Sequence, residues 1–422
     1  MIDYSKYLLT HRRTLHKKPE LGWCEFWTTA YIVEELEKLG WKLNLGTSQI
    51  NKDAVMGRSD KLVEQEIERA KKEGVSEETL RRMRGYTGCI AVWDTDLPGP
   101  TTALRFDIDC VGVEESYDPC HKLNIEGFRS EHSGCMHSCG HDGHTAVGLT
   151  VAKWVEQHSK ELKGKILLVF QPAEEGVRGA AAQAASGLLD DVDYLLGSHL
   201  SLICKSGEIC TCPTNVLATT KLDVKLKGMA AHPTMSPELG RDALTCLCSM
   251  VLSLKGMGSH GKGMTSINIG KIEAGEFRNV VAAHGVMQME VRGATTEINN
   301  YQVKKSLQII KGIAEAYGVS YEVEKAGEAS SLSNDRELID LVSKVASTVP
   351  GVEQVIEEKK MGASEDFTML AQRVQAMGGK SEFFIVGADR EGAHHQSNFD
   401  FDENALNVAF LIFKGCLEQL NI

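Results

Sequence analysis

Short apolar runs rich in β-branched and aromatic residues alternate with segments of helical spacing along most of this chain. Four of these runs are GCIAVW, TTALRF, KILLVF and DYLLGSH, and a helical segment at about 142–158 separates two of them. Strands with near-continuous apolar sequence that are separated by helices belong to sheets covered on both faces, because such strands are buried on both sides. The alternation therefore predicts an α/β fold built on a parallel or mixed sheet.

A block with a different order interrupts this alternation from about residue 216. It reads β-α-β-β-α-β, with strands such as TKLDVKLKG and TSINIGKI and a helix over NNYQVKKSLQIIKGIAEAYG. This is the split βαβ order of a small, ferredoxin-like α+β domain. A chain of 422 residues is also too long for one compact core. We therefore predict one domain from residues 1–215 and 328–422, with residues 216–327 inserted as a second domain.

Residues 51–86 are dense in charge and form a second interruption. Val63, Ile67 and Ala70 make a narrow apolar stripe at helical spacing, and Ser76 is placed to cap another short helix. The segment is predicted to be a helical excursion on the surface. Two interpretations stay open: a solvated helical pair, or a segment at a subunit contact or over the mouth of a functional site.

Composition excludes several classes of protein. The formal net charge is -12, which disfavours a nucleic-acid partner because phosphate binding needs clustered Lys and Arg. No apolar run is long enough to cross a membrane, and the N-terminus lacks the apolar core and cleavage site of a secretory signal. Twelve Cys without regular spacing are typical of reduced thiols. We expect a cytoplasmic protein with neither a nucleic-acid nor a membrane partner.

The segment 134-GCMHSCGHDGHTA-146 has the densest set of candidate metal ligands. One Gly separates Cys139 from His141, so both side chains can point to one side of a loop, and Asp142 is expected to cap the helix that follows. Thiolate and imidazole are ligands of Zn, Mn and Co sites. An isolated Cys–His pair would more often be structural, but three His and two Cys within eleven residues favour a metal site. His137 and His144 are weaker candidates.

Two adjacent carboxylates, Glu174 and Glu175, follow the apolar run KILLVF. Side chains of neighbouring residues diverge, so one carboxylate can bind a metal while the other accepts a proton from an activated water. Glu-Glu pairs are common on surfaces and are weak evidence alone. Their place at the carboxyl end of a strand strengthens the case, because ligands bind at that edge of open α/β sheets.

Three further sets of polar residues lie at strand ends. His199 closes DYLLGSH, and the pair His394 and His395 follows EFFIVG. Asp107 and Asp109 lie on the same side of the extended segment LRFDIDC, where a carboxylate could orient a metal-bound imidazole. A single His in such a place is more often a core residue, so these positions gain weight only as a group.

Taken together, these motifs resemble a known family. The chain contains, in order, HRRTLHKKPELGWCEF, ALRFDID, MHSCGHDGHTA, FQPAEEG, AAHPTMSPELGRDAL, EFRNVVAAHG, GASEDF and HHQSNFDFDENAL. From about residue 11 to 410 it resembles the metal-dependent aminoacylase and carboxypeptidase-like amidohydrolases, which include hippurate hydrolases and indole-acetyl amino-acid hydrolases. The charged segment 51–86 and phrases such as GLLDDVDYLLGSHL resemble the aminobenzoyl-glutamate utilisation branch.

The resemblance implies a two-metal site. Its ligands would be Cys139 as a bridge, with His141, Glu175, His199 and a C-terminal His, for which spacing from Phe399 favours His395 over His394. Glu174 would be the general base, and Asp109 would orient a ligand. The family branch favours Mn²⁺, whereas Zn²⁺ fits the Cys ligand equally well.

The resemblance also implies a role for the inserted domain as a lid and dimerisation domain. His232 would hold the oxyanion in the site of a partner subunit. Asn279 and Arg292 would hold the substrate's carbonyl or carboxylate. The partner would be an identical chain or a paralogue. The implied reaction is cleavage of an N-acyl amino acid of the aminobenzoyl-glutamate type. The alternatives are an aminoacylase, hippurate hydrolase or dipeptidase, and a catalytically idle binding or scaffold homologue.

Overall fold

The computed structural model describes residues 3–422, which form two compact units. The first unit comprises the chain up to Thr214 together with Ser333–Gly362 and Asp366–Ile422. The second unit comprises Asn215–Leu332 and Ala363–Glu365. The second unit is thus inserted into the sequence of the first.

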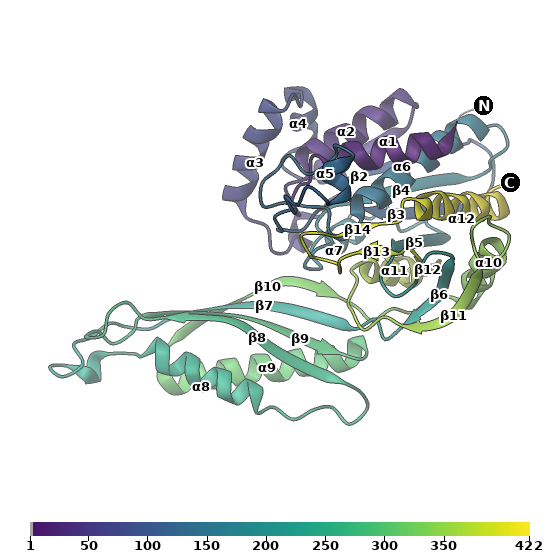
Figure 1. Ribbon diagram of the computed structural model, residues 1–422. Coiled ribbons are helices and arrows are strands. Elements are labelled where there is room, and N and C mark those ends of the chain that lie inside the picture. Colours follow the sequence, from purple (N-terminus) through teal and green to yellow (C-terminus); the bar gives the residue numbers. More distant parts are fainter. Residues whose placement is uncertain (1–2) are drawn as a thin grey trace. The chain divides into compact units, whose positions relative to one another are not determined.

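An eight-stranded mixed sheet forms the centre of the first unit, in the order β1-β2-β4-β3-β5-β12-β6-β11 (Figure 1). Its strands are β1 (Lys42–Leu45), β2 (Cys89–Asp94), β3 (Thr101–Asp107), β4 (Lys165–Gln171), β5 (Tyr194–Leu200), β6 (Glu208–Thr214), β11 (Gln354–Lys360) and β12 (Lys380–Val386). A separate two-stranded ribbon pairs β13 (Arg390–Glu391) with β14 (Asp400–Phe401). The four neighbouring strands β4, β3, β5 and β12 run parallel.

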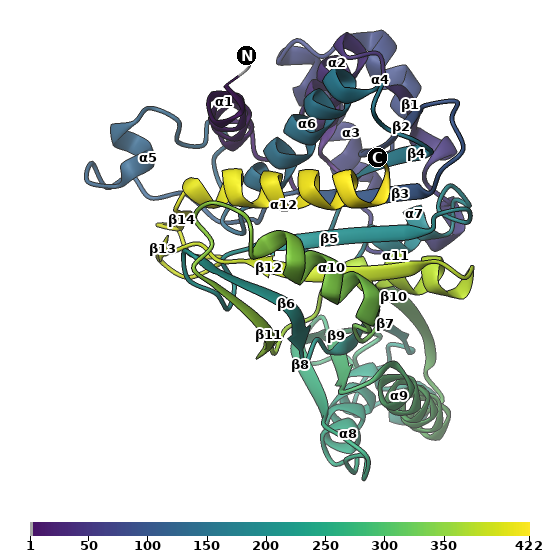
Figure 2. The same ribbon diagram turned by 90° about the vertical axis from the view of Figure 1, so that its right-hand side faces the viewer.

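Helices cover both faces of this sheet, which confirms the predicted α/β class. They are α1 (Tyr4–His16), α2 (Phe26–Lys38), α3 (Asp60–Lys72), α4 (Glu77–Met83), α5 (Lys122–Ile125), α6 (His141–His158), α7 (Ala180–Ala184), α10 (Arg336–Ala346), α11 (Phe367–Ala376) and α12 (Asn404–Leu420). Helices α6, α10 and α12 share one core with alternate residues of β5, whereas Gly197 of β5 lies against Phe367 of α11 on the other face (Figure 2). Within residues 3–422, no helix has the length and apolar character of a membrane span.

Helix α1 and strand β6 have no counterpart among the predicted elements. The buried face of α1 contains His11, Arg12 and His16 beside Leu8 and Leu15. A helix whose buried face is largely polar shows little hydrophobic periodicity, which is the signal that sequence analysis depends on. Two features explain why α1 is buried: Leu8 packs in the main core, and Arg12 and His16 bond to Asp142.

The charged segment 51–86 forms the predicted helical pair. Ser59 caps α3 through the Leu62 N–H, and Ser76 caps α4 through the Thr79 N–H. Val63 and Ala70 are buried in a cluster with residues of α2 and the segment before it, including Phe26 and Cys24. The pair is therefore packed against the first unit and has an apolar contact face.

The second unit has the predicted β-α-β-β-α-β order. Its elements are β7 (Ala218–Lys227), α8 (Ala243–Lys255), β8 (Thr265–Ala274), β9 (His284–Gly293), α9 (Thr296–Tyr317) and β10 (Ser320–Ala329). The strands pair antiparallel in the order β10-β7-β9-β8, and α8 and α9 cover one face of this sheet (Figure 1). Alternate residues of β9 are buried, so its other side chains lie on the face without helices.

A buried acid in β12 predicts a pH-dependent stability. Glu382 is fully buried, and neither carboxylate oxygen has a hydrogen-bond partner among residues 3–422. Burial, reinforced by the charge of Asp340, raises the pKa of Glu382 well above its usual range. Above the usual pKa of a Glu, the unfolded chain releases this proton while the folded protein keeps it. Stability should therefore fall by about 1.4 kcal/mol per pH unit until the raised pKa is reached.

Replacing Glu382 by Gln removes the titrating group, so the variant should gain stability over the wild type as pH rises from 5 to 7. Urea unfolding followed by Trp fluorescence measures this, because all five Trp lie in the first unit. Glu358→Gln is the control, since Glu358 is exposed on the nearby strand β11. Equal pH dependence of the wild type and Glu382→Gln would contradict the prediction.

Candidate active site

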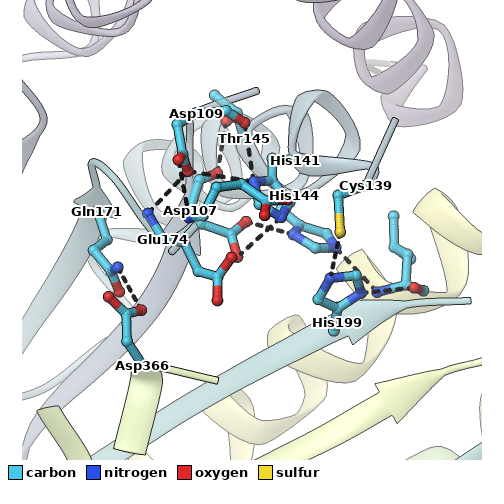
Figure 3. Close-up of polar contacts among 12 residues, drawn as sticks. Asp107, Asp109, Cys139, His141, His144, Thr145, Gln171, Glu174, His199 and Asp366 are labelled. Atoms are coloured by element: carbon cyan, nitrogen blue, oxygen red, sulfur yellow. Dashed lines mark hydrogen bonds and ion pairs between the residues drawn. The ribbon is translucent and has the colours of Figure 1, made fainter. Parts of the chain in front are cut away.

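The candidate residues of the first unit converge at one edge of its sheet. Glu174 and Glu175 follow β4, and Asp109 follows β3. His199 lies near the end of β5, and His395 follows β12 and β13. Because these strands run parallel, their carboxyl ends lie at the same edge, where ligands bind in open α/β sheets. Figure 3 shows the side chains from β3, the β4 turn, the start of α6 and β5 gathered there.

The start of α6 brings Cys139 and His141 to this edge. Gly140 lies between them with φ of +90°, a left-handed conformation that Gly adopts without steric cost. The ligand atoms of Cys139, His141 and His199 lie within 4.8 Å of one another. The prediction that Asp142 caps α6 is wrong. Gly140 is the N-cap residue, and the Asp142 carboxylate accepts the Gly143 N–H and contacts Arg12 and His16 of α1.

Backbone carbonyls determine which ring nitrogens of two histidines are free. His141 Nδ1 lies 2.9 Å from the Asp109 carbonyl oxygen, and His199 Nδ1 lies 2.7 Å from that of Leu200. A carbonyl can only accept, so each Nδ1 carries a proton, and in the neutral imidazole the lone pair is on Nε2. Among residues 3–422, His141 Nε2 is buried with no hydrogen-bond partner, and His199 Nε2 lies 3.5 Å from Cys139 Sγ. Both imidazoles are thus oriented as metal ligands are.

The Asp109 carboxylate organises the turn that carries the two glutamates. It is fully buried and accepts the Glu174 N–H on Oδ1 and the Glu175 N–H on Oδ2, each at 3.0 Å. Its Oδ1 also lies 3.4 Å from His141 Nδ1. One carboxylate therefore holds both the glutamate turn and a candidate ligand in place.

Two sets of candidate ligand atoms share Cys139. One set is Cys139, His141 and His199, the other is Cys139, Glu175 and His395, and the atoms within each set lie within 4.8 Å of one another. Thiolate, imidazole and carboxylate are the donors found in Zn²⁺ and Mn²⁺ sites. Together with the buried Nε2 of His141, which has no hydrogen-bond partner among residues 3–422, this donor set fits a pair of divalent cations that Cys139 would help to hold.

Burial and neighbouring charges shift the pKa values of these groups. Burial, reinforced by Glu175, raises the pKa of the Cys139 thiol well above its usual range. Burial alone would lower the pKa of His141. The electrostatic interactions of His141 with Asp107 and Cys139 outweigh burial, so the pKa of His141 is raised. Burial lowers the pKa of His199. Because a cation stabilises a thiolate, loading of the site would release the Cys139 proton.

Two adjacent histidines lie beside Cys139. His394 Nδ1 is 3.6 Å from Cys139 Sγ, and its Nε2 accepts the Leu202 N–H at 3.3 Å. In that tautomer the proton is on Nδ1, so His394 has no lone pair directed at the site. His395 Nε2 lies 3.2 Å from Glu175 Oε1. This geometry supports His395 as the last ligand, which stays a prediction.

The other three predicted site residues belong to the second unit. His232 is exposed, and its Nδ1 accepts the N–H groups of Thr234 and Met235 at 3.3 and 3.1 Å, so its Nε2 carries a proton that it can donate. Asn279 is exposed between β8 and β9. Arg292 lies on the face of β9 without helices, where its Nε donates to Glu290 Oε2 at 2.9 Å.

Sequence analysis gave little or no weight to two polar pairs near the ligands. His144 Nδ1 lies 2.5 Å from Asp107 Oδ1, while its Nε2 accepts the Leu200 N–H at the end of β5. Arg12 and His16 of α1 both contact the carboxylate that follows His141. The available signal was the spacing of Arg12 and His16, which puts two polar residues on one face of a helix.

Comparisons with known proteins extend over nearly the whole chain. Residues 103–419 match the family described as peptidase family M20/M25/M40. The chain is 46% identical over 420 residues to a homolog of a p-aminobenzoyl-glutamate hydrolase subunit from Haemophilus influenzae, with 99% of each chain covered. It is 39% identical over 414 residues to the indole-3-acetyl-aspartic acid hydrolase of Enterobacter agglomerans, covering 96% of this chain and 95% of that one.

A solved structure shares this fold. The aminobenzoyl-glutamate utilization protein from Klebsiella pneumoniae matches with a TM-score of 0.84 and 32% identity, covering 98% of this chain and 96% of that chain. The similarity therefore includes both units of the fold.

Proposed function

Because the chain belongs to peptidase family M20/M25/M40, and is therefore a hydrolase of amide or peptide bonds, we propose that it cleaves the amide bond of an N-acyl amino acid. The observation that carries this proposal is the turn after β4. There Asp109 accepts the backbone N–H groups of Glu174 and Glu175, so that Glu175 lies in a ligand cluster with Cys139 and Glu174 is the adjacent carboxylate at the same edge.

Two divalent cations would be held by Cys139, His141, Glu175, His199 and His395. The family branch favours Mn²⁺, and Zn²⁺ is the alternative. When bound, such cations polarise an amide carbonyl and make water a stronger nucleophile.

The chain's own groups would handle protons and substrate. Glu174 takes a proton from the attacking water and gives it to the leaving amine nitrogen. His232 is the candidate donor to the oxyanion, through the proton on its Nε2, and it would act in the site of a partner subunit. Asn279 and Arg292 are candidates for the substrate's carbonyl and carboxylate, since a guanidinium can hold a carboxylate bidentately.

The substrate is proposed to be an aromatic acyl group joined to an acidic amino acid. The relatives named above are p-aminobenzoyl-glutamate and indole-3-acetyl-aspartic acid hydrolases, and both names describe such amides. In a chain with net charge -12, a substrate with two carboxylates requires local cations, for which Arg292 is one candidate.

A substrate panel on metal-analysed protein tests this function. We expect kcat/KM for p-aminobenzoyl-glutamate and indole-3-acetyl-aspartate to exceed that for hippurate, acetyl amino acids and dipeptides by at least about tenfold, the discrimination that one well-placed charged contact can provide. Preference for hippurate, acetyl amino acids or dipeptides would favour a hippurate hydrolase, aminoacylase or dipeptidase. No hydrolysis of any amide by metal-loaded protein would favour an idle binding homologue.

A further inference from the structure

The turn that carries Glu174 contains an unusual backbone conformation. After Pro172 ends the strand, Ala173 has φ of +53°, a left-handed conformation that costs free energy for any residue with a side chain. Such a conformation persists only where its surroundings impose it. Ala173 is fully buried, so its N–H group must also find a partner within the protein.

A second buried carboxylate supplies that partner. Glu25 Oε1 accepts the Ala173 N–H at 2.7 Å, and Glu25 Oε2 lies 2.5 Å from Thr87 Oγ1. Because Asp109 accepts the Glu174 and Glu175 N–H groups, three consecutive N–H groups of the turn each donate to a buried carboxylate oxygen. The backbone of the turn is therefore held by two carboxylates, those of Glu25 and Asp109.

Glu25 does not have the usual local role of a residue in its position. It is the N-cap residue of α2, yet its side chain makes no cap hydrogen bond. Glu20 performs that task instead, because its carboxylate accepts the N–H groups of Trp27 and Thr28. The Glu25 side chain is thereby left to reach the Ala173 turn.

The segment around Glu25 also lies directly against this turn. A Cβ on Gly22 would come within 2.9 Å of the Ala173 Cα, so only Gly permits this approach. Trp23 packs in one apolar cluster with Ala173, and the Glu20 carbonyl accepts the N–H of Cys110, next to Asp109. The segment 20–25 therefore contacts both the turn that carries Glu174 and the segment that carries Asp109.

We propose that Glu25 is a positioning residue for the reaction: by accepting the Ala173 N–H while anchored to Thr87, it sets the direction of the Glu174 carboxylate. This inference rests on the proposed role of Glu174 as the base. Burial, followed by the charge of Asp109, raises the pKa of Glu25 to about 8. A neutral carboxyl can still accept the Ala173 N–H on one oxygen while its O–H points to Thr87. The positioning role of Glu25 therefore requires these two hydrogen bonds and does not require a negative charge.

Glu25→Ala is expected to lower kcat by about 100-fold, because a catalytic group displaced by about 1 Å loses that much rate. KM and metal content should stay near wild-type values, since no ligand or substrate contact is removed. Glu25→Gln should restore most of kcat, because its amide oxygen can accept the Ala173 N–H and its NH₂ can donate to Thr87. Thr87→Val removes only the hydrogen bond between Thr87 and Glu25, so it should show a smaller loss of kcat. It is the test variant if Glu25→Ala does not fold.

Glu20→Ala is the matched control, since Glu20 is equally buried in the same segment but its carboxylate bonds to α2 and Arg69, and its backbone bond to Cys110 is kept in the variant. It should lower thermal stability and leave kcat per folded, metal-loaded molecule unchanged. Wild-type kcat in Glu25→Ala, no rescue by Glu25→Gln, or equal losses of kcat in Glu20→Ala would each overturn the proposal. If Glu174→Gln proves fully active, the base assignment fails instead, whatever the Glu25 variants do.

Discussion

Replacing Glu174 by Gln is expected to lower kcat by about 10²- to 10⁴-fold, the usual contribution of a general acid–base group. Gln has nearly the same shape, but its amide cannot take a proton from water. The bond that holds the turn comes from the Glu174 backbone N–H to Asp109 and does not involve the side chain. Steady-state kinetics with p-aminobenzoyl-glutamate measures the loss, and elemental analysis and Tm should match the wild type.

Glu175→Gln is the matched control for this prediction. Glu175 is the neighbouring residue on the same turn, and its carboxylate lies with Cys139 and His395 in a ligand cluster. This variant should lose bound metal as well as turnover, because an amide is a poorer ligand than a carboxylate. Full activity of Glu174→Gln would remove the base assignment. Loss of metal in Glu174→Gln would make Glu174 a ligand, since it also lies within 4.8 Å of the His141 and Glu175 ligand atoms.

Arg12→Met should lower the free energy of unfolding by about 3–5 kcal/mol, the usual cost of removing one partner from a buried ion pair. The Arg12 side chain is fully buried and contacts Asp142 at 3.1 Å, Asp400 at 2.6 Å and Glu403 at 2.9 Å. Its guanidinium also lies 4.5 Å from the centre of the Phe401 ring. The variant leaves these carboxylates buried with fewer positive partners. Urea unfolding followed by Trp fluorescence measures the loss in the first unit.

The adjacent residue provides the comparison. Arg13 also pairs with Glu403, but its side chain is 34% exposed. Water screens such a pair, so Arg13→Met should cost less than about 1 kcal/mol. Similar losses in the two variants would show that burial of Arg12 is not what makes it important.

Much of the fold could be predicted because its strands are apolar and its helices amphipathic. The mixed α/β sheet, the β-α-β-β-α-β unit and the cap at Ser76 follow from local spacing and are all present. Helix α1 was not predicted, because its buried face is built from residues such as Arg12 and His16 that local rules place in water. Asp142 shows the same limit: capping is a local rule, and two side chains of α1 override it.

The sequence by itself determined which chemical groups this protein has: a Cys and His motif, an adjacent pair of glutamates and polar residues at the ends of apolar strands. Only the tertiary structure decided which nitrogen of His141 and His199 is free, because carbonyls of Asp109 and Leu200 select the tautomers. It also decided that Glu25, far from Ala173 in the chain, accepts the Ala173 N–H in the turn that carries Glu174. The physical reason is that a hydrogen bond depends on where two groups lie in space, whereas sequence patterns report only burial and local conformation.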